Sequence, residues 1–152
     1  MCSDPVFPPT CAAGREVIVL DTNILLDLWV GRDPAVRPVE QALRARRLHW
    51  LATPAMRDEL ARVLNYPHIA ARIATGPGDA ASVLRSFERY TQVVAAPTPA
   101  GVRCADPDDQ KFIDLAVQHQ AWLLSKDNAI LIMRKQLLTP GVRAQCATEF
   151  IV

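Results

Sequence analysis

The sequence predicts an α/β protein with a mainly parallel sheet, and three observations lead to that prediction. Short, β-rich apolar runs alternate along the chain with longer segments of helical periodicity. The run Val17–Leu20 is apolar at every position, as in a strand that is buried on both faces. The apolar residues make up 50% of the 152 residues and the charged residues 22%, so the composition is globular and the core needs no disulfides.

The first part of the chain is expected to contain two strands and two helices. Val17–Leu20 is the first strand, and Asn23–Trp29 is helical. The stretch Gly31 to Pro34 breaks the chain before a second helix, Pro38–Arg47, whose arginine-rich end suits the negative end of a helix dipole. Leu48–Ala52 is the second strand, again short and mostly apolar.

Three helices are expected before the third strand. Thr53 has the character of an N-cap and Pro54 suits the first helical position, so a helix runs from there to about Asn65. Two further helices occupy His68–Tyr90, divided by the glycines and proline at 76–78. Gln92–Ala95 is the third strand.

The last part of the chain repeats the alternation of helix and strand. The expected elements are a helix from Asp106-Pro107 to about Gln120, a fourth strand at Trp122–Ser125, a helix from Asp127-Asn128 through Lys135, a last strand at Val142–Gln145, and a closing segment at Glu149–Val152. Residues 1–15, with three prolines and no apolar core, are expected to be a flexible lead.

Charge, cysteines and histidines restrict the function only weakly. A net charge of +1 excludes no partner, since a local basic rim can hold phosphates on a neutral protein. The cysteines show no metal-binding spacing and are interpreted as free thiols of a reducing compartment: Cys2, Cys11, Cys104 and Cys146. The histidines are interpreted as surface or packing residues: His49, His68 and His119. With no secretory signal and no apolar run of the ~20 residues that a membrane span requires, we expect a cytoplasmic protein.

Several acids stand where strands end or where helices face the core. Asp21 and Asp127 lie just past predicted strands, at the edge where α/β proteins bind ligands, although each is also well placed to cap a helix. At 100° per residue, Glu59 borders the buried stripe of its helix. Asp109 lies one turn before Phe112, on the buried side, although an acid at this third helical position can also reach back to the cap residue.

Asp21, Glu59, Asp109 and Asp127 are therefore expected to converge at one edge of the sheet, with Asp106 as a fifth acid. Clustered carboxylates repel one another, and some stay protonated unless a cation joins them. Oxygen ligands without cysteine or histidine select Mg²⁺ or Mn²⁺ rather than zinc. Such a site suits the hydrolysis of phosphodiesters by metal-activated water.

Four segments resemble, in this order, the PIN-domain family of nucleases: VIVLDTNILL, TPAMRDELARVL, DPDDQKFIDLAVQHQAWLLSKDNAIL and TEFIV. The resemblance covers one domain, residues 16–152, and its nearest branch looks like the VapC-like toxins of toxin–antitoxin pairs. It implies a three-layer α/β/α sandwich around a mainly parallel sheet and a ribonuclease that depends on Mg²⁺ or Mn²⁺. It also implies a cognate antitoxin protein as a partner, and homodimers are common in the family.

The resemblance also assigns residues. The family's acids match Asp21, Glu59, Asp109 and Asp127, and the extra acid of this branch matches Asp106. Asn23 and Ser125 match polar residues that support the ligands. The chain departs from many relatives at Ala129, where they carry a second acid, and its residues 68–90 match only as helices.

The sequence thus predicts a metal-dependent endoribonuclease, in which Asp21, Glu59 and Asp109 hold one ion and Asp127 helps to hold it or a second. Candidates for binding RNA phosphates are Arg57, Arg62, Arg103, Lys126, Arg134 and Lys135. Two other functions stay open. One is a metal- or partner-binding module that keeps the fold without turnover. The other is a phosphatase with Asp21 as nucleophile, although Asn23 occupies the place where the haloacid dehalogenase type needs a second aspartate.

Overall fold

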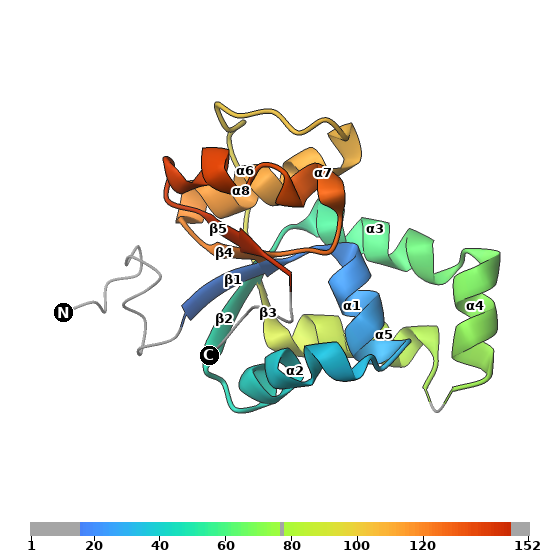
Figure 1. Ribbon diagram of the computed structural model, residues 1–152. Coiled ribbons are helices and arrows are strands. Elements are labelled where there is room, and N and C mark those ends of the chain that lie inside the picture. The colour runs from blue at the N-terminus through green and yellow to red at the C-terminus, as the bar shows by residue number, and fades with distance from the viewer. Residues whose placement is uncertain (1–15, 77, 147–152) are drawn as a thin grey trace.

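Five parallel strands form the centre of the fold, in the order β3-β2-β1-β4-β5 (Figure 1). The computed structural model describes residues 16–76 and 78–146. The strands are β1 (Glu16–Leu20), β2 (Leu48–Ala52), β3 (Thr91–Val93), β4 (Trp122–Leu124) and β5 (Arg143–Gln145). Helices cover both faces of this sheet, so the predicted α/β sandwich is confirmed.

The helices are α1 (Thr22–Trp29), α2 (Arg37–Arg44), α3 (Pro54–Leu64), α4 (Pro67–Ala74), α5 (Ala80–Tyr90), α6 (Gln110–His119), α7 (Asn128–Leu131) and α8 (Arg134–Leu138), with the 3-10 turns η2 (Pro34–Val36) and η3 (Pro107–Asp109). Figure 1 shows α2 and α5 on one face of the sheet and α6, α7 and α8 on the other. α3 and α4 extend beyond the sheet at the ends of the strands. None of the helices in the described part of the chain is long and apolar enough to cross a membrane.

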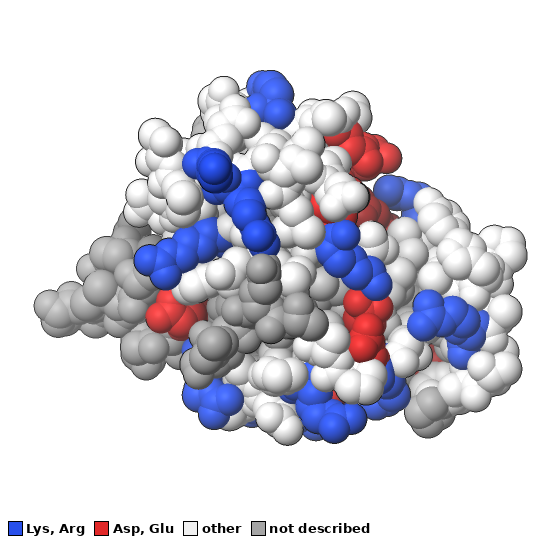
Figure 2. All heavy atoms as spheres, viewed as in Figure 1, with Lys and Arg blue, Asp and Glu red and all other residues white. Residues whose placement is uncertain are grey.

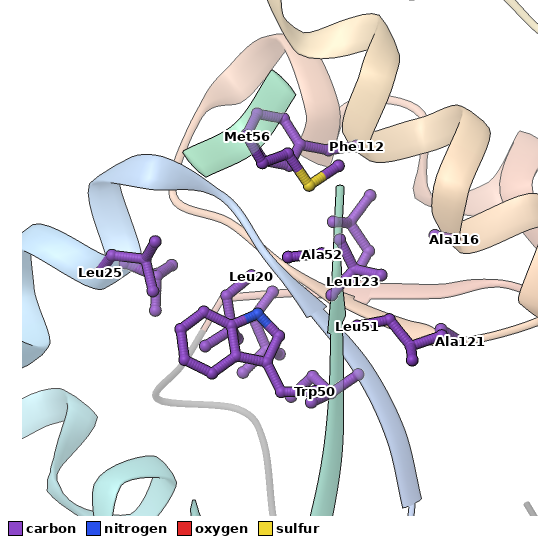
Figure 3. Close-up of a cluster of buried hydrophobic side chains, with 14 of the residues drawn as sticks. Leu20, Leu25, Trp50, Leu51, Ala52, Met56, Phe112, Ala116, Ala121 and Leu123 are labelled. Carbon is purple, nitrogen blue, oxygen red and sulfur yellow. The ribbon is translucent and has the colours of Figure 1, made fainter. Parts of the chain in front are cut away.

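The central strands are buried on both faces, as the apolar run in the sequence predicts. In β1 every residue after Glu16 is buried, and all of β2 is buried. Alternate side chains of β2 enter different halves of the core, so Trp50 and Leu51 leave the strand on opposite sides (Figure 3). The Trp50 ring packs 5.6 Å from that of Trp29 and 5.4 Å from that of Phe87, which ties α1 and α5 to the sheet.

Most predicted elements are confirmed to within a few residues, including the two helices on either side of residues 76–78. The helix expected from Asn128 through Lys135 is wrong: Met133 leaves the helical conformation, and two short helices form. No glycine or proline marks this break in the sequence. The helix expected from Pro107 begins instead as the 3-10 turn η3, because Asp106 Oδ1 accepts the Asp108 N–H at 3.0 Å and tightens the first turn.

The predictions for residues 1–15, with Cys2 and Cys11, and for Glu149–Val152 lie outside the described residues. Among the described cysteines, Cys104 is a free thiol.

The direction of winding reverses between β1 and β4, which are neighbours in the sheet although they lie far apart in the sequence. At such a reversal the loops that follow the two strands diverge, and a crevice opens at the carboxyl ends of the strands. The Asp21 N–H donates to the Leu124 carbonyl at 3.2 Å, so the two strand ends are joined at this point. The fold therefore brings the residues after β1 and β4 to one edge.

Candidate active site

Asp21 is the buried acid at the end of β1. Its side chain is 3% exposed, and its two oxygens have different partners. Oδ1 accepts the Ile24 N–H at 3.0 Å and caps α1, while Oδ2 accepts a short hydrogen bond from the Ser125 hydroxyl. Burial raises the pKa of Asp21 to about 6, although both hydrogen bonds act in the opposite direction. Asp21 therefore caps α1 with one oxygen and, with the other, binds Ser125 at the carboxyl end of β4.

Ser125 connects the ends of β1 and β4. Its side chain is fully buried, and its hydroxyl donates to Asp21 while accepting the Asp127 N–H at 2.9 Å. The Ser125 hydroxyl thus fixes both the Asp21 side chain and the backbone at Asp127. Asn23, for which a similar supporting role is predicted, is exposed and lies at the cavity described below.

Three other acids form a close cluster. Asp106, Asp109 and Asp127 each offer a carboxylate oxygen, and the three oxygens lie within 4.8 Å of one another. Asp127 Oδ1 accepts the Ala129 N–H at 2.9 Å and caps α7, so this acid, like Asp106, uses one oxygen as a cap. At such distances ionised carboxylates repel strongly, so the cluster favours either bound protons or a cation.

Asp109 is the acid of this cluster whose side chain is least well compensated by hydrogen bonds. It occupies the N-cap position of α6, but its side chain caps nothing. Its Oδ2 is buried and has no hydrogen-bond partner among the described residues. Burial is the largest cause that raises the pKa of Asp109 to about 7, followed by the hydrogen bond and charge of Asp127 and the charges of Asp106 and Asp21.

The arrangement fits a hard divalent cation. A buried acceptor without a partner costs free energy, and a cation satisfies it directly. The donors are carboxylate oxygens from Asp106, Asp109 and Asp127, the ligand type that Mg²⁺ and Mn²⁺ accept. Asp21 lies close enough to affect the pKa of Asp109 through its charge. Four of the five predicted acids therefore share one electrostatic environment.

Glu59, on α3, is held apart from that cluster. The Thr22 hydroxyl donates to Oε2 at 2.5 Å, and the Lys111 ammonium forms a close ion pair with Oε1. Among the described residues, the close group of three acids includes neither Glu59 nor Asp21. The sharing of one ion by Asp21, Glu59 and Asp109 stays a prediction.

A cavity of about 380 Å³ opens beside these acids. Asp21, Asn23, Glu59 and Asp109 line it. The rest of the wall mixes apolar, polar and charged side chains: Thr22, Leu26, Asp27, Val63, Tyr66, His68, Ile69, Arg72, Phe112 and Lys126. The Lys126 ammonium forms an ion pair with Asp27 at 2.8 Å and remains half exposed. The cavity wall therefore carries both acids and cations, and Asp109 is the member of the three-acid cluster that lines it.

The predicted phosphate-binding residues divide into two groups. Lys126 lies at the cavity, as a phosphate contact requires. Arg57 forms an ion pair with Glu88 of α5 at 2.7 Å, and Arg62 and Arg103 are at the surface but do not line the cavity. Arg134 donates to the Ala144 carbonyl at 3.2 Å, and Lys135 is exposed on α8.

Three residues of the site were not predicted. Thr22 and Lys111 hold Glu59, and Arg72 lines the cavity from the region of α4. The positions of Thr22 and Lys111 beside predicted acids, Asp21 and Asp109, are the signal in the sequence that points to them. Arg72 has no such signal.

Comparison with known proteins agrees with this geometry. The family model described as PIN domain matches residues 17–129, which include all five predicted acids. A search of curated proteins finds no match.

Proposed function

The chain belongs to the PIN-domain family, and on that premise we propose that it is a metal-dependent endoribonuclease. PIN domains are generally nucleases, so the family supports a phosphodiester hydrolase. The observation that carries the proposal is the cluster of Asp106, Asp109 and Asp127, with one buried Asp109 oxygen that has no partner among the described residues. One member of the cluster, Asp109, lines a cavity that also carries Lys126 and Arg72.

The roles follow from the positions of the side chains. Asp106, Asp109 and Asp127 would hold Mg²⁺ or Mn²⁺, and Asp21 would add charge from the end of β1. When bound, such an ion lowers the pKa of water and stabilises negative charge on a phosphate. Ser125 orients Asp21 and the backbone of Asp127. Lys126 and Arg72 would bind phosphates that flank the bond to be cut.

We further propose that the enzyme is the toxin of a toxin–antitoxin pair. The support is the resemblance of its motifs to the VapC-like branch. A cognate antitoxin protein would then cover the cavity, and a homodimer is consistent with the family. Expression of the chain alone should slow growth through loss of RNA, and co-expression of a small protein encoded beside it should restore growth. Normal growth with active enzyme would reject the toxin role while leaving the nuclease role intact.

The nuclease proposal is tested with purified protein, labelled single-stranded RNA and either Mn²⁺ or Mg²⁺. We expect internal cleavage that EDTA abolishes and that Asp109→Asn and Asp21→Asn reduce by a factor of roughly a hundred or more. Asp58→Asn, an exposed acid on the same helix as Glu59, is the matched control and should keep full activity. Cleavage that persists in the Asp109 and Asp21 variants would reject the proposal. Mn²⁺ binding without any cleavage would favour a binding module that has lost turnover.

A further inference from the structure

A second cavity, of about 650 Å³, lies between the end of α1, α2 and α5. Four arginines and two aromatic residues line it: Arg32, Arg44, Arg85, Arg89, Trp29 and Tyr90. Asp79 also lines it, but its carboxylate caps α5 and accepts the Ser82 N–H at 2.8 Å. Arg44 also pairs with Glu40 at 3.2 Å, so after Asp79 and Glu40 are set against the four arginines, positive charge is still in excess here. Figure 2 shows basic side chains along the lower edge of the view, over α2 and α5.

Two arginines at this face hold a backbone conformation that residues with a Cβ rarely adopt. The φ angle is +50° at Arg32 and +60° at Arg46, in the left-handed region that favours glycine or asparagine. Arg46 lies over the Tyr90 ring at 5.1 Å and donates to the Arg89 carbonyl at 3.4 Å, so it supports the end of α5. Arg32 lines the cavity. At Arg32 a glycine would be the more relaxed residue, so the arginine at this position is a candidate for a binding role.

This cavity adjoins the candidate active site. Arg72, which lines the catalytic cavity, packs against Gly31: a Cβ at that glycine would lie 2.3 Å from the guanidinium of Arg72. The next residue, Arg32, lines the arginine-rich cavity. Lys126 and Arg72 thus line one cavity, Arg32 and Arg85 line the other, and the two cavities approach each other where Arg72 meets Gly31.

We propose that the arginine-lined cavity is a second binding site for the RNA backbone, which continues the track of the substrate away from the catalytic cavity. This inference rests on the proposed nuclease function, and it places the distant part of a longer RNA substrate in the arginine-lined cavity. Guanidinium groups bind phosphate through paired hydrogen bonds, and a single strand bends easily to follow such a path. RNA is favoured over an acidic protein because Arg72 meets Gly31, next to Arg32, and a strand held in the first cavity would pass this point into the second.

The double variant Arg85→Gln/Arg89→Gln tests this site, with Arg143→Gln on β5 as the control for loss of surface charge. Affinity is measured by fluorescence anisotropy in EDTA, for single-stranded RNAs of about four and about sixteen nucleotides. For the long RNA we expect the double variant to bind about tenfold more weakly. The slope of log K against log salt concentration should also become shallower, by about 0.7 for each phosphate that the variant no longer neutralises. The short RNA should bind as before. With Mn²⁺, KM for the long RNA should rise while kcat is unchanged.

Arg32→Gly separates binding from folding, because glycine relaxes the left-handed backbone and should keep or raise the Tm. We expect this variant to lose affinity for the long RNA all the same. Long-RNA affinity and salt dependence equal to those of the unchanged protein in both variants would overturn the inference. It would likewise be overturned if the double variant lost binding of a polyglutamate peptide but kept that of RNA. Failure of the unchanged protein to cut any RNA would instead reject the proposed function.

Discussion

Replacing Asp21 with asparagine should remove a pH-dependent loss of stability from the metal-free protein. Burial raises the pKa of Asp21 to about 6 from an ordinary value of 3.8, so the folded protein keeps a proton that the unfolded chain releases. The free energy of unfolding therefore falls as the pH rises through this range, because the folded state binds more protons than the unfolded state. Asparagine has nearly the same shape and carries no charge at any pH, so the variant lacks this slope.

The size of the effect follows from the pKa. A difference of about two pKa units corresponds to about 3 kcal/mol at high pH, of which roughly half develops between pH 5 and pH 8. For a chain of this length, 1 kcal/mol changes the Tm by roughly 2–4 °C. The Tm of Asp21→Asn, relative to the unchanged protein, should therefore increase by about 3–6 °C between pH 5 and pH 8.

Scanning calorimetry in EDTA, at one ionic strength and at both pH values, measures this difference. Asp58→Asn, which removes an exposed carboxylate from α3, is the control for the loss of one negative charge. A Tm difference for Asp21→Asn that stays constant or shrinks would refute the reasoning, because the buried carboxylate would then be ionised in the folded protein without cost.

Three further predictions concern the metal and the residues around it. The Kd for Mn²⁺, measured by calorimetry, should fall by about tenfold or more between pH 5.5 and pH 7.5. The reason is that Asp21 and Asp109, with pKa values of about 6 and about 7, must lose protons to bind an ion. A Kd that does not change would contradict this. Lys111→Met should tighten Mn²⁺ binding by about three- to tenfold, since Glu59 loses its neutralising partner, and weaker binding would show that the pair positions Glu59 instead. Ser125→Ala removes a hydrogen bond that lowers the pKa of Asp21, so the acid limb of the pH–rate profile should move to higher pH; an unchanged profile would mean that Asp21 need not be ionised.

Asp21 is predictable from sequence because its neighbours define its environment. A charged residue directly after a buried apolar run needs compensation, and here the compensation comes from the Ile24 N–H and the Ser125 hydroxyl. The parallel sheet is equally predictable, since alternation of strand and helix leaves few other arrangements. The positions of Asp21 and Asp127 at one edge then follow from topology alone.

The partners of Glu59 are a different case. Helical angle places this residue at the border of a buried stripe, and it is half-buried as expected. Its contacts, however, come from Thr22 on α1 and Lys111 on α6, and those depend on how three helices pack. The same limit applies to Arg57, whose ion pair with Glu88 joins α3 to α5. Periodicity shows which way a side chain faces but does not identify what lies there.

The sequence leaves open whether each aspartate caps a helix or binds a metal ion. The two roles are compatible, because each carboxylate has two oxygens and the cap uses only one of them. Asp21, Asp106 and Asp127 all cap turns or helices with Oδ1. The backbone N–H groups at these ends offset part of the repulsion among the acids, and Oδ2 of each carboxylate is not needed for the cap. Asp109 stands at a helix start without capping it, and its buried Oδ2 has no partner among the described residues. Capping thus fixes the carboxylates in place around Asp109, which makes the caps part of the proposed metal site rather than an alternative to it.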